Sequence, residues 1–372
     1  MSIDATPETA IVDGDGHLFE NLKGIINHLP SDYRDAFRSG RLDVPRHVFP
    51  AHSIFHAIPV DQYGMSDRGK HLPAVPEWLD FLDSVGIEQT VLYPTMALHV
   101  GLMRDPHFAV ALCRAYNDWV AEAYTSHSSG KFNAVALLPM QRPEAAAGEL
   151  RRAVQDLGLV AGFLPGQGLT NHLGSPVYYP VYEAAEELGV GLSIHGAYHQ
   201  GFGFDDYNHF APAHALGHPF ALLIALGGLV FNGVYDRFPG LRTAYLEGGA
   251  AWILLASERF SESYSAFRPL PWEEGLHLGE GVSVDDYLTD LVQSRRLVVG
   301  CEGGEHHLTY AVEQFGMSPF MYSSDFPHEV DATSCAHEIE ELREAEMKPA
   351  DVGATLGENA RAFYRLEVPP TG

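Results

Sequence analysis

The chain has 372 residues, of which 46% are hydrophobic, enough for a large buried core in one or two domains. It carries 49 Asp and Glu against 23 Lys and Arg, so its formal net charge is −26. A charge of this sign repels phosphate backbones and anionic membrane surfaces, which makes nucleic acid and membranes poor partners.

The cysteines and the first residues indicate the compartment. Cys113, Cys301 and Cys335 have no CxxC spacing and are odd in number, so we expect no disulfide framework and a reducing environment. Residues 1–10 are polar and acidic and show no signal peptide, and the longest apolar run, 219–231, is too short to span a bilayer. We therefore expect a soluble, cytoplasmic protein.

The first predicted element is a short apolar strand that ends in polar residues, Ala10–His17, with the sequence Ala-Ile-Val-Asp-Gly-Asp-Gly-His. This pattern predicts a buried strand that delivers side chains at its carboxyl end. A helix over about 21–37 is expected next. The segment 41–73 contains several prolines and little periodicity, which predicts a long loop able to cover a site.

From residue 76 onward, predicted helices and strands alternate. The expected helices are 76–85, 106–127, 143–157, 176–188, 211–231, 250–264, 284–293 and 305–315. The expected strands are 89–93, 132–138, 159–164, 190–195, 241–247, 297–301 and 320–323. The segment 263–283 is interpreted as a looped insertion, and 335–364 as two closing helices.

Together with the first strand, this series implies a parallel α/β sheet with right-handed crossovers. Eight strands are the number that closes a (β/α)8 TIM barrel. We expect one domain over 1–372, with 41–73 and 263–283 as loop insertions over the carboxyl-end face. An open doubly wound sheet is the alternative, but no GxGxxG turn follows the first strand, which argues against nucleotide binding.

In such a barrel, residues at the carboxyl ends of the strands converge on one face. Asp15 and His17 share one side of the first strand, because side chains alternate along a strand. The fifth strand ends in His195, the sixth in Glu247 and the eighth in Asp325. Carboxylates gathered in this way repel one another unless a divalent cation relieves the repulsion, so the pattern predicts a metal site.

Each of these residues taken alone has an ordinary explanation. Asp15 and His17 could be solvated turn residues, and His195 could be a core histidine bonded to a backbone carbonyl. Glu247 could cap the next helix, and Asp325 could belong to a turn. The metal-site hypothesis rests on their combination at the ends of four apolar strands.

Other polar residues near these strand ends are expected to play supporting roles. Four histidines follow the fifth strand, and for each a solvated or supporting role is favoured: His199, His209, His214 and His218. Among them, His199 and His214 could reach the metal or the substrate. His328 is expected to support Asp325, and Glu302 could line the pocket beside a buried Cys301.

Six segments of the chain carry a resemblance to a known family. They are Val12–His17, Pro180–Gly189 leading to His195, Tyr235–Arg242, Leu246–Gly249, Ser324–His328 and Gly357–Arg361. In this order and spacing they resemble the amidohydrolase superfamily, in particular the branch that includes aminocarboxymuconate-semialdehyde decarboxylase and gamma-resorcylate decarboxylase. The resemblance covers almost the whole chain and implies a metal-bearing (β/α)8 barrel.

The resemblance also implies a ligand set and partners. Asp15, His17, His195 and Asp325 would bind one divalent metal, with zinc as the first choice and manganese or iron as alternatives. A small molecule is the implied substrate, and the dimers common among relatives imply a homodimer. Decarboxylases of this branch place a histidine where this chain has Glu247, which adds negative charge near the expected substrate carboxylate.

Several functions are compatible with this site. The leading hypothesis is a metal-dependent lyase that performs non-oxidative decarboxylation of a small aromatic or unsaturated carboxylic acid, with Asp325 or Glu247 moving a proton. The alternative is hydrolysis of an amide, ester or lactone by metal-activated water, which Glu247 and the acidic net charge favour. Fe(II)-dependent oxygen chemistry and a non-catalytic binding protein are the further alternatives.

Overall fold

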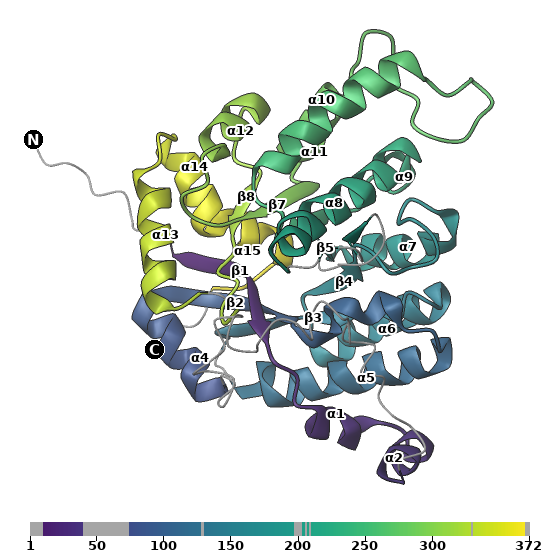
Figure 1. Cartoon of the computed structure of the whole chain (residues 1–372), viewed down its shortest axis with the longest axis vertical. Coiled ribbons are helices and arrows are strands. Elements are labelled where there is room, and N and C mark those ends of the chain that lie inside the picture. Colours follow the sequence, from purple (N-terminus) through teal and green to yellow (C-terminus); the bar gives the residue numbers. More distant parts are fainter. Residues whose placement is uncertain are drawn as a thin grey trace, which may run out of the picture.

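Eight parallel strands form the centre of the protein and follow one another around the sheet in chain order (Figure 1). This computed structural model describes residues 10–39, 74–127, 130–196, 203–204, 207, 210–328 and 330–368. The strands are β1 (Ile11–Leu18), β2 (Ile87–Pro94), β3 (Phe132–Leu137), β4 (Ala161–Pro165), β5 (Gly191–His195), β6 (Thr243–Leu246), β7 (Leu297–Cys301) and β8 (Phe320–Tyr322). This sequential order confirms the (β/α)8 barrel and excludes a doubly wound sheet.

Helices surround the strands (Figure 1). Those that follow strands or connect them are α4 (Val75–Val85), α5 (Pro106–Ala123), α6 (Pro143–Leu157), α7 (Tyr179–Leu188), α8 (Phe210–Phe231), α9 (Val234–Arg237), α10 (Ala251–Ala266), α11 (Val284–Gln293), α12 (Leu308–Phe315) and α13 (Ala332–Glu344). Because helices cover the outer face, the strands are buried on both sides, and all eight residues of β1 are buried.

Three predicted helices differ clearly in the structure. The helix expected over 21–37 is divided into α1 (Leu22–His28) and α2 (Ser31–Arg38), since Pro30 lacks an N–H and restricts the residue before it. The first closing helix begins at Ala332 rather than 335, because the carboxylate of Asp331 accepts hydrogen bonds from the backbone of Thr333 and Ser334. The second is α14 (Pro349–Gly353) and α15 (Asn359–Tyr364), joined by the π-helical residues Ala354–Glu358.

Of the two expected insertions, only the segment 263–283 lies among the described residues. The segment 41–73 lies outside the described residues, as do His199 and His209. The insertion that begins at 263 continues α10 to Ala266 and then runs without helix or strand to 283. Its backbone at Leu276 donates to the carbonyl of Phe231, at the C-terminal end of α8, with an N–O distance of 3.0 Å. That end of α8 leads into the amino end of β6, so the insertion is attached on the side away from the strand carboxyl ends.

Helix α8 is the most apolar helix of the barrel. Its residues Ala211–Phe231 are long and apolar enough to cross a membrane by length and composition alone, and 44% of the most apolar stretch is buried in the protein. The helical segment is therefore longer than the apolar run 219–231 considered from the sequence. Here it packs against β5 and beside α9 and α10 as one of the barrel's outer helices (Figure 1).

The seam between β8 and β1 is held by one buried carboxylate. Asp13 of β1 is fully buried and accepts hydrogen bonds from the backbone N of Ser324 at 2.8 Å, from the Ser324 hydroxyl at 2.9 Å and from the Thr90 hydroxyl at 2.6 Å. The backbone of Asp325 also donates to the carbonyl of Asp15 at 3.0 Å. Asp13 therefore fixes the segment that carries Asp325 against the strand that carries Asp15.

Replacing Asp13 by Ala should destabilise the whole barrel. The change leaves the buried donors of Ser324 and Thr90 without an acceptor, and we expect a loss of at least about 3 kcal/mol in the free energy of unfolding. Urea denaturation measures the loss. Asp290→Ala, at an exposed position on α11, is the control and should change stability by less than about 0.5 kcal/mol. Equal stability of the two variants would contradict the role of Asp13.

Candidate metal centre

The five residues predicted at the strand ends lie together in the structure. Nε2 of His17 is 3.4 Å from Oδ1 of Asp15 and 3.4 Å from Oδ1 of Asp325. Nε2 of His195 is 3.5 Å from Oδ2 of Asp15 and 3.5 Å from Oε2 of Glu247. The strand ends of β1, β5, β6 and β8 therefore contribute side chains to one cluster.

The backbone turns sharply at the two carboxylates that follow β6 and β8. Glu247 has a φ of 62° and Asp325 a φ of 52°, in the left-handed region that costs non-glycine residues about 1–2 kcal/mol. Among the described non-glycine residues, Arg295 and Arg365 also have positive φ, but they follow the C-terminal ends of α11 and α15, where a left-handed residue is common. The strained backbone directs both carboxylates into the cluster, and such strain is concentrated at functional sites.

Glu247 does not serve as the cap of the next helix, one of its ordinary explanations. Helix α10 begins after Ala250, whose backbone N donates to the carboxylate of Glu305. Both Glu247 oxygens instead face histidines of the cluster, at 2.8 Å and 3.5 Å for Oε2 and 3.9 Å for Oε1. Its carboxylate is therefore available for chemistry at the centre.

The tautomers of two histidines are set by backbone carbonyls. Nδ1 of His17 donates to the carbonyl of Pro94 at 3.1 Å, and Nδ1 of His195 donates to the carbonyl of Gly196. A neutral imidazole that donates from Nδ1 has its lone pair on Nε2. Both Nε2 atoms lie in the cluster, so these histidines present the atom that would bind a cation.

The spacing of these groups fits a cation better than hydrogen bonding. Distances of 3.4–3.5 Å between the donor atoms exceed the 2.7–3.2 Å of a normal N–H···O bond. Among the described residues, both oxygens of Asp15 and Nε2 of His17 and His195 are buried without a hydrogen-bond partner. Ligands about 2.1 Å from a tetrahedral metal lie about 3.4 Å apart. Asp15, His17 and His195 form one of three groups whose ligand atoms lie within 4.8 Å of one another and could hold a metal ion.

Each of the two strained carboxylates also has a histidine at hydrogen-bond distance. Nδ1 of His328 lies 2.7 Å from Oδ1 of Asp325, and Nδ1 of His218 lies 2.8 Å from Oε2 of Glu247. His328 therefore stands where the sequence indicated a supporting residue. His218, for which a solvated or supporting role is predicted, has a buried side chain beside Glu247.

The remaining predicted residues lie at the edge of the site. His214 precedes His218 by one helical turn, and the two rings are 5.1 Å apart, but His214 is exposed. Glu302 is also exposed and lines a small cavity together with Glu247 and Asp325. The four-residue spacing of the two histidines on one helix face was the sequence signal that could have identified His218.

The charges of the site depend on one another. Burial raises the pKa of Asp15 to about 7. Burial opposes charge on His195, but the carboxylates of Asp15 and Glu247 outweigh it and raise the pKa to about 9. Burial also opposes charge on Glu247, yet His218 and His195 hold its pKa well below the usual range. Without a cation the cluster therefore retains protons near neutral pH, and Glu247 is ionised.

Comparison with known proteins gives the family. A family model described as amidohydrolase matches residues 89–366, about three quarters of the chain. The chain belongs to the amidohydrolase family. The matched residues include β5, β6 and β8, whose ends carry His195, Glu247 and Asp325.

Curated relatives of this amidohydrolase bear decarboxylase names. It is 29% identical over 171 residues to 2-amino-3-carboxymuconate-6-semialdehyde decarboxylase of Dictyostelium discoideum, a match covering 46% of each chain. It is 30% identical over 171 residues to gamma-resorcylate decarboxylase of Polaromonas sp. strain JS666, covering 43% of this chain and 51% of that one. The chain thus spans about half the length of the curated relatives it matches.

Solved structures share the fold over nearly the whole chain. 5-Carboxyvanillate decarboxylase from Sphingomonas paucimobilis superposes with a TM-score of 0.69 at 19% identity, over 97% of this chain and 100% of that chain. A 5-carboxyvanillate decarboxylase from Novosphingobium aromaticivorans, solved with bound manganese, superposes with a TM-score of 0.71 at 18% identity, over 96% of this chain and 97% of that one.

Metal binding by the metal-free protein should strengthen as the pH rises. At pH values below 7, Asp15 and His195 carry protons that a cation must displace, whereas above pH 9 neither does. We expect the affinity for Mn²⁺ or Zn²⁺ to increase across this range, with protons released on binding. Calorimetric titration in buffers of different ionisation enthalpy measures both quantities, and an affinity independent of pH would contradict this assignment.

Proposed function

We propose that this amidohydrolase is a metal-dependent lyase that removes CO2 from a small aromatic or unsaturated carboxylic acid. Its curated relatives and solved neighbours named above are decarboxylases. The observation that carries the proposal is the pair His218–Glu247, a proton-handling pair that adjoins the Asp15, His17, His195 and Asp325 cluster. Decarboxylation needs such a pair, because a proton must reach the carbon that CO2 leaves.

We further propose that Asp15, His17, His195 and Asp325 hold one divalent ion. When bound, the ion would orient the substrate carboxylate and balance the negative charge that develops as CO2 leaves. Two imidazoles with two carboxylates suit zinc, which is the first expectation, and they also suit manganese, which is bound in solved neighbours. His328 would hold Asp325 in position through its 2.7 Å contact.

Within this proposal, His218 takes over the part of the missing strand-six histidine. Glu247 is ionised over the physiological range, so it is a poor proton donor by itself. Its carboxylate instead orients the imidazole of His218 and stabilises that ring when it carries a proton. The imidazole then delivers the proton to the substrate carbon, so that a helix, α8, supplies the proton-transfer group instead of the strand end.

Hydrolysis is the second candidate function. The ionised Glu247 carboxylate could equally accept a proton from water during attack on an amide, ester or lactone carbonyl. Decarboxylation is preferred because the named relatives perform it.

All three cysteines are free and buried, which supports a reducing compartment, and we propose the cytoplasm.

Product analysis separates the two functions. Metal-loaded protein is incubated in ¹⁸O water with a panel of hydroxylated aromatic acids, amides and lactones. We expect CO2 release from an aromatic acid without incorporation of ¹⁸O into the decarboxylated product. Asp325→Asn should lower this turnover at least about 100-fold while the fold is retained, whereas Glu313→Gln on the surface of α12 should not change it. Labelled hydrolysis products would instead select the hydrolase.

The His218–Glu247 pair can be tested separately from the metal. His218→Asn and Glu247→Gln should each lower kcat by about 10²–10⁴-fold, because each removes one half of a proton-transfer pair. The bound metal, measured by elemental analysis, should stay at the wild-type stoichiometry in both. His337→Ala, an exposed histidine of α13, is the matched control. Loss of metal in the His218 variant would make this residue a ligand and refute the assigned role.

A further inference from the structure

The carboxyl end of β2 supplies none of the expected metal ligands, yet it contacts two histidines of the candidate metal centre. The carbonyl of Pro94, the last residue of β2, accepts a hydrogen bond from Nδ1 of His17 at 3.1 Å. The hydroxyl of Thr95, the next residue, lies 3.1 Å from Nε2 of His328. Two consecutive residues therefore contact one histidine that faces the cation site and one that faces the carboxylate of Asp325.

The hydroxyl of Thr95 is available for this contact because another residue caps the helix that Thr95 precedes. Thr95 is the N-cap of the 3-10 helix η2 (Met96–Leu102), where a threonine hydroxyl commonly accepts from the first backbone N–H groups. It makes no such hydrogen bond here. The carboxylate of Glu20 accepts instead, from the backbone N of Met96 at 3.0 Å and from that of Ala97 at 2.7 Å.

Glu20 is an unfavourable residue for this purpose. Its side chain is 8% exposed, and burial raises its pKa to about 7. Its hydrogen bonds come from backbone N–H groups and not from a lysine or arginine, so the charged form has no cation beside it. A threonine hydroxyl would cap the same helix without placing a carboxylate in the interior. The exchange of caps is explained if the hydroxyl of Thr95 is required at His328.

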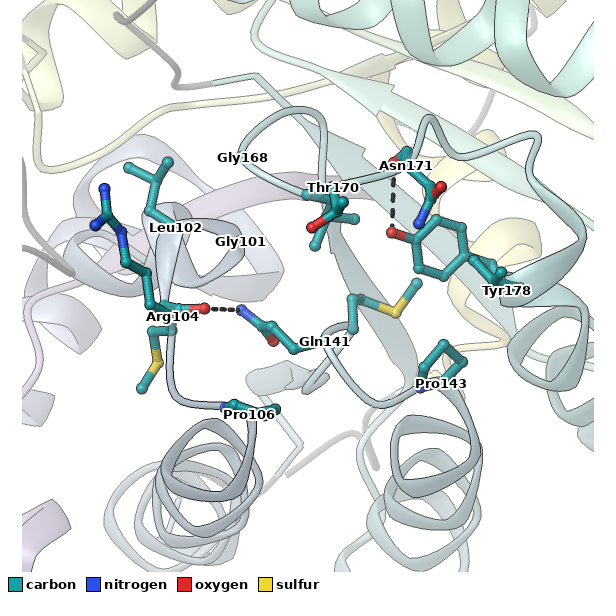
Figure 2. Close-up of a pocket in the computed structure, with 14 residues that line it drawn as sticks. Gly101, Leu102, Arg104, Pro106, Gln141, Pro143, Gly168, Thr170, Asn171 and Tyr178 are labelled. Atoms are coloured by element: carbon teal, nitrogen blue, oxygen red, sulfur yellow. Dashed lines mark hydrogen bonds between the residues drawn. The ribbon is translucent and has the colours of Figure 1, made fainter.

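Both ends of η2 are fixed by the surrounding structure. At its start, the backbone N of Thr95 donates to the carbonyl of Leu18, the last residue of β1, at 3.1 Å. At its end, the side-chain amide of Gln141 donates to the carbonyls of Val100 at 2.6 Å and Met103 at 3.2 Å, and Figure 2 shows the second of these bonds. The position of Thr95 is therefore set by the barrel and not by the histidine that it contacts.

The cavity next to η2 carries no inference of its own. It has a volume of about 710 Å³ and is lined by Gln141, Arg104, Thr170 and Tyr178 (Figure 2). The amide N–H groups of Gln141 are engaged by η2, and Arg104 is exposed to solvent. Its polar groups do not converge on one point, so no ligand class is indicated.

We propose that Thr95 is a positioning residue of the metal centre, which holds His328 so that its Nδ1 atom faces Asp325. The inference rests on the proposed metal site, in which Asp325 is a ligand. A neutral imidazole that donates from Nδ1 accepts at Nε2, and the Thr95 hydroxyl is a donor at that atom. The hydroxyl thus favours the orientation in which His328 makes its 2.7 Å contact with Asp325.

The same imidazole also lies against a second expected ligand. The rings of His328 and His17 are 4.2 Å apart and inclined by 31°. A rotation of His328 would therefore disturb His17 as well as Asp325. Because outer contacts of this kind orient metal ligands, one hydroxyl on β2 can influence two of the four ligands without touching either.

Titration of the metal-free protein with Mn²⁺ tests the role of the hydroxyl. Thr95→Val has nearly the same shape without the hydroxyl, and we expect it to raise the dissociation constant for Mn²⁺ about 10–100-fold. It should also change the visible absorption spectrum of the Co²⁺-loaded protein, which reports ligand geometry. Thr95→Ser keeps the hydroxyl and should restore both. Thr289→Val, on the outer helix α11, is the matched control and should change neither.

The exchange of caps is tested by Glu20→Gln. Without the carboxylate, the Thr95 hydroxyl should return to the N–H groups of η2, and the Mn²⁺ dissociation constant should rise about tenfold although Glu20 contacts no ligand. The same change in the Thr95→Val background should have little further effect, because both act through one hydroxyl. Glu313→Gln, on the surface of α12, is the control.

All of these values are measured with the metal alone, so failure of the proposed reaction would leave them unchanged. Wild-type affinity for Mn²⁺ and a wild-type Co²⁺ spectrum in Thr95→Val would overturn the positioning role and leave the metal site standing. A serine variant that binds Mn²⁺ as weakly as the valine variant would also overturn it, because the hydroxyl would then not be the active group. Restored binding in the serine variant supports the role even if Thr95→Val lowers the melting temperature.

Binding of neither metal by the wild-type protein would overturn the metal site and the role of Thr95 together.

Discussion

The structure is organised around the cost of placing three carboxylates in a space that excludes most water. Asp15 is fully buried, and Glu247 and Asp325 face the same centre. Isolated buried carboxylates cost several kcal/mol each, so the surroundings must supply positive charge or protons. Four histidines surround them, two beside Asp15 and one beside each of the other carboxylates, and the carboxylates raise the pKa of one of the four, His195, to about 9. A divalent cation would complete the balance.

The histidines divide into two kinds by the atoms that they present. His17 and His195 donate from Nδ1 to backbone carbonyls and present Nε2 at ligand spacing. His218 and His328 present Nδ1 to carboxylates at hydrogen-bond distances. The first kind is suited to hold a cation and the second to hold or move a proton. The backbone carbonyls of Pro94 and Gly196 bind Nδ1 of His17 and His195, whereas Nδ1 of the other two histidines faces a carboxylate. Residue type alone does not reveal this difference.

The sequence was sufficient for those features that depend on local pattern. Apolar strands ending in polar residues predicted both the barrel and the convergence of Asp15, His195 and Asp325, because all parallel strands end on one face. It was not sufficient where tertiary contacts decide. His218 lies 23 residues beyond His195, and only the packing of α8 against the barrel brings it to Glu247. The positive φ of Glu247 and Asp325 is likewise imposed by the fold, and no residue preference predicts it.

Under the proposed function, the helix next to Glu247 accounts for the absence of a histidine after β6. A glutamate alone after β6 would only add to the negative charge of the centre, but α8 supplies the imidazole that the strand lacks. Under the proposed function, proton transfer depends on how firmly α8 is seated, since a displacement of about 1 Å would break the 2.8 Å contact between His218 and Glu247. The outer side of α8 is apolar, uncharged and partly exposed. Its inner side packs against β5 and next to α10, and this packing sets the position of His218 beside Glu247.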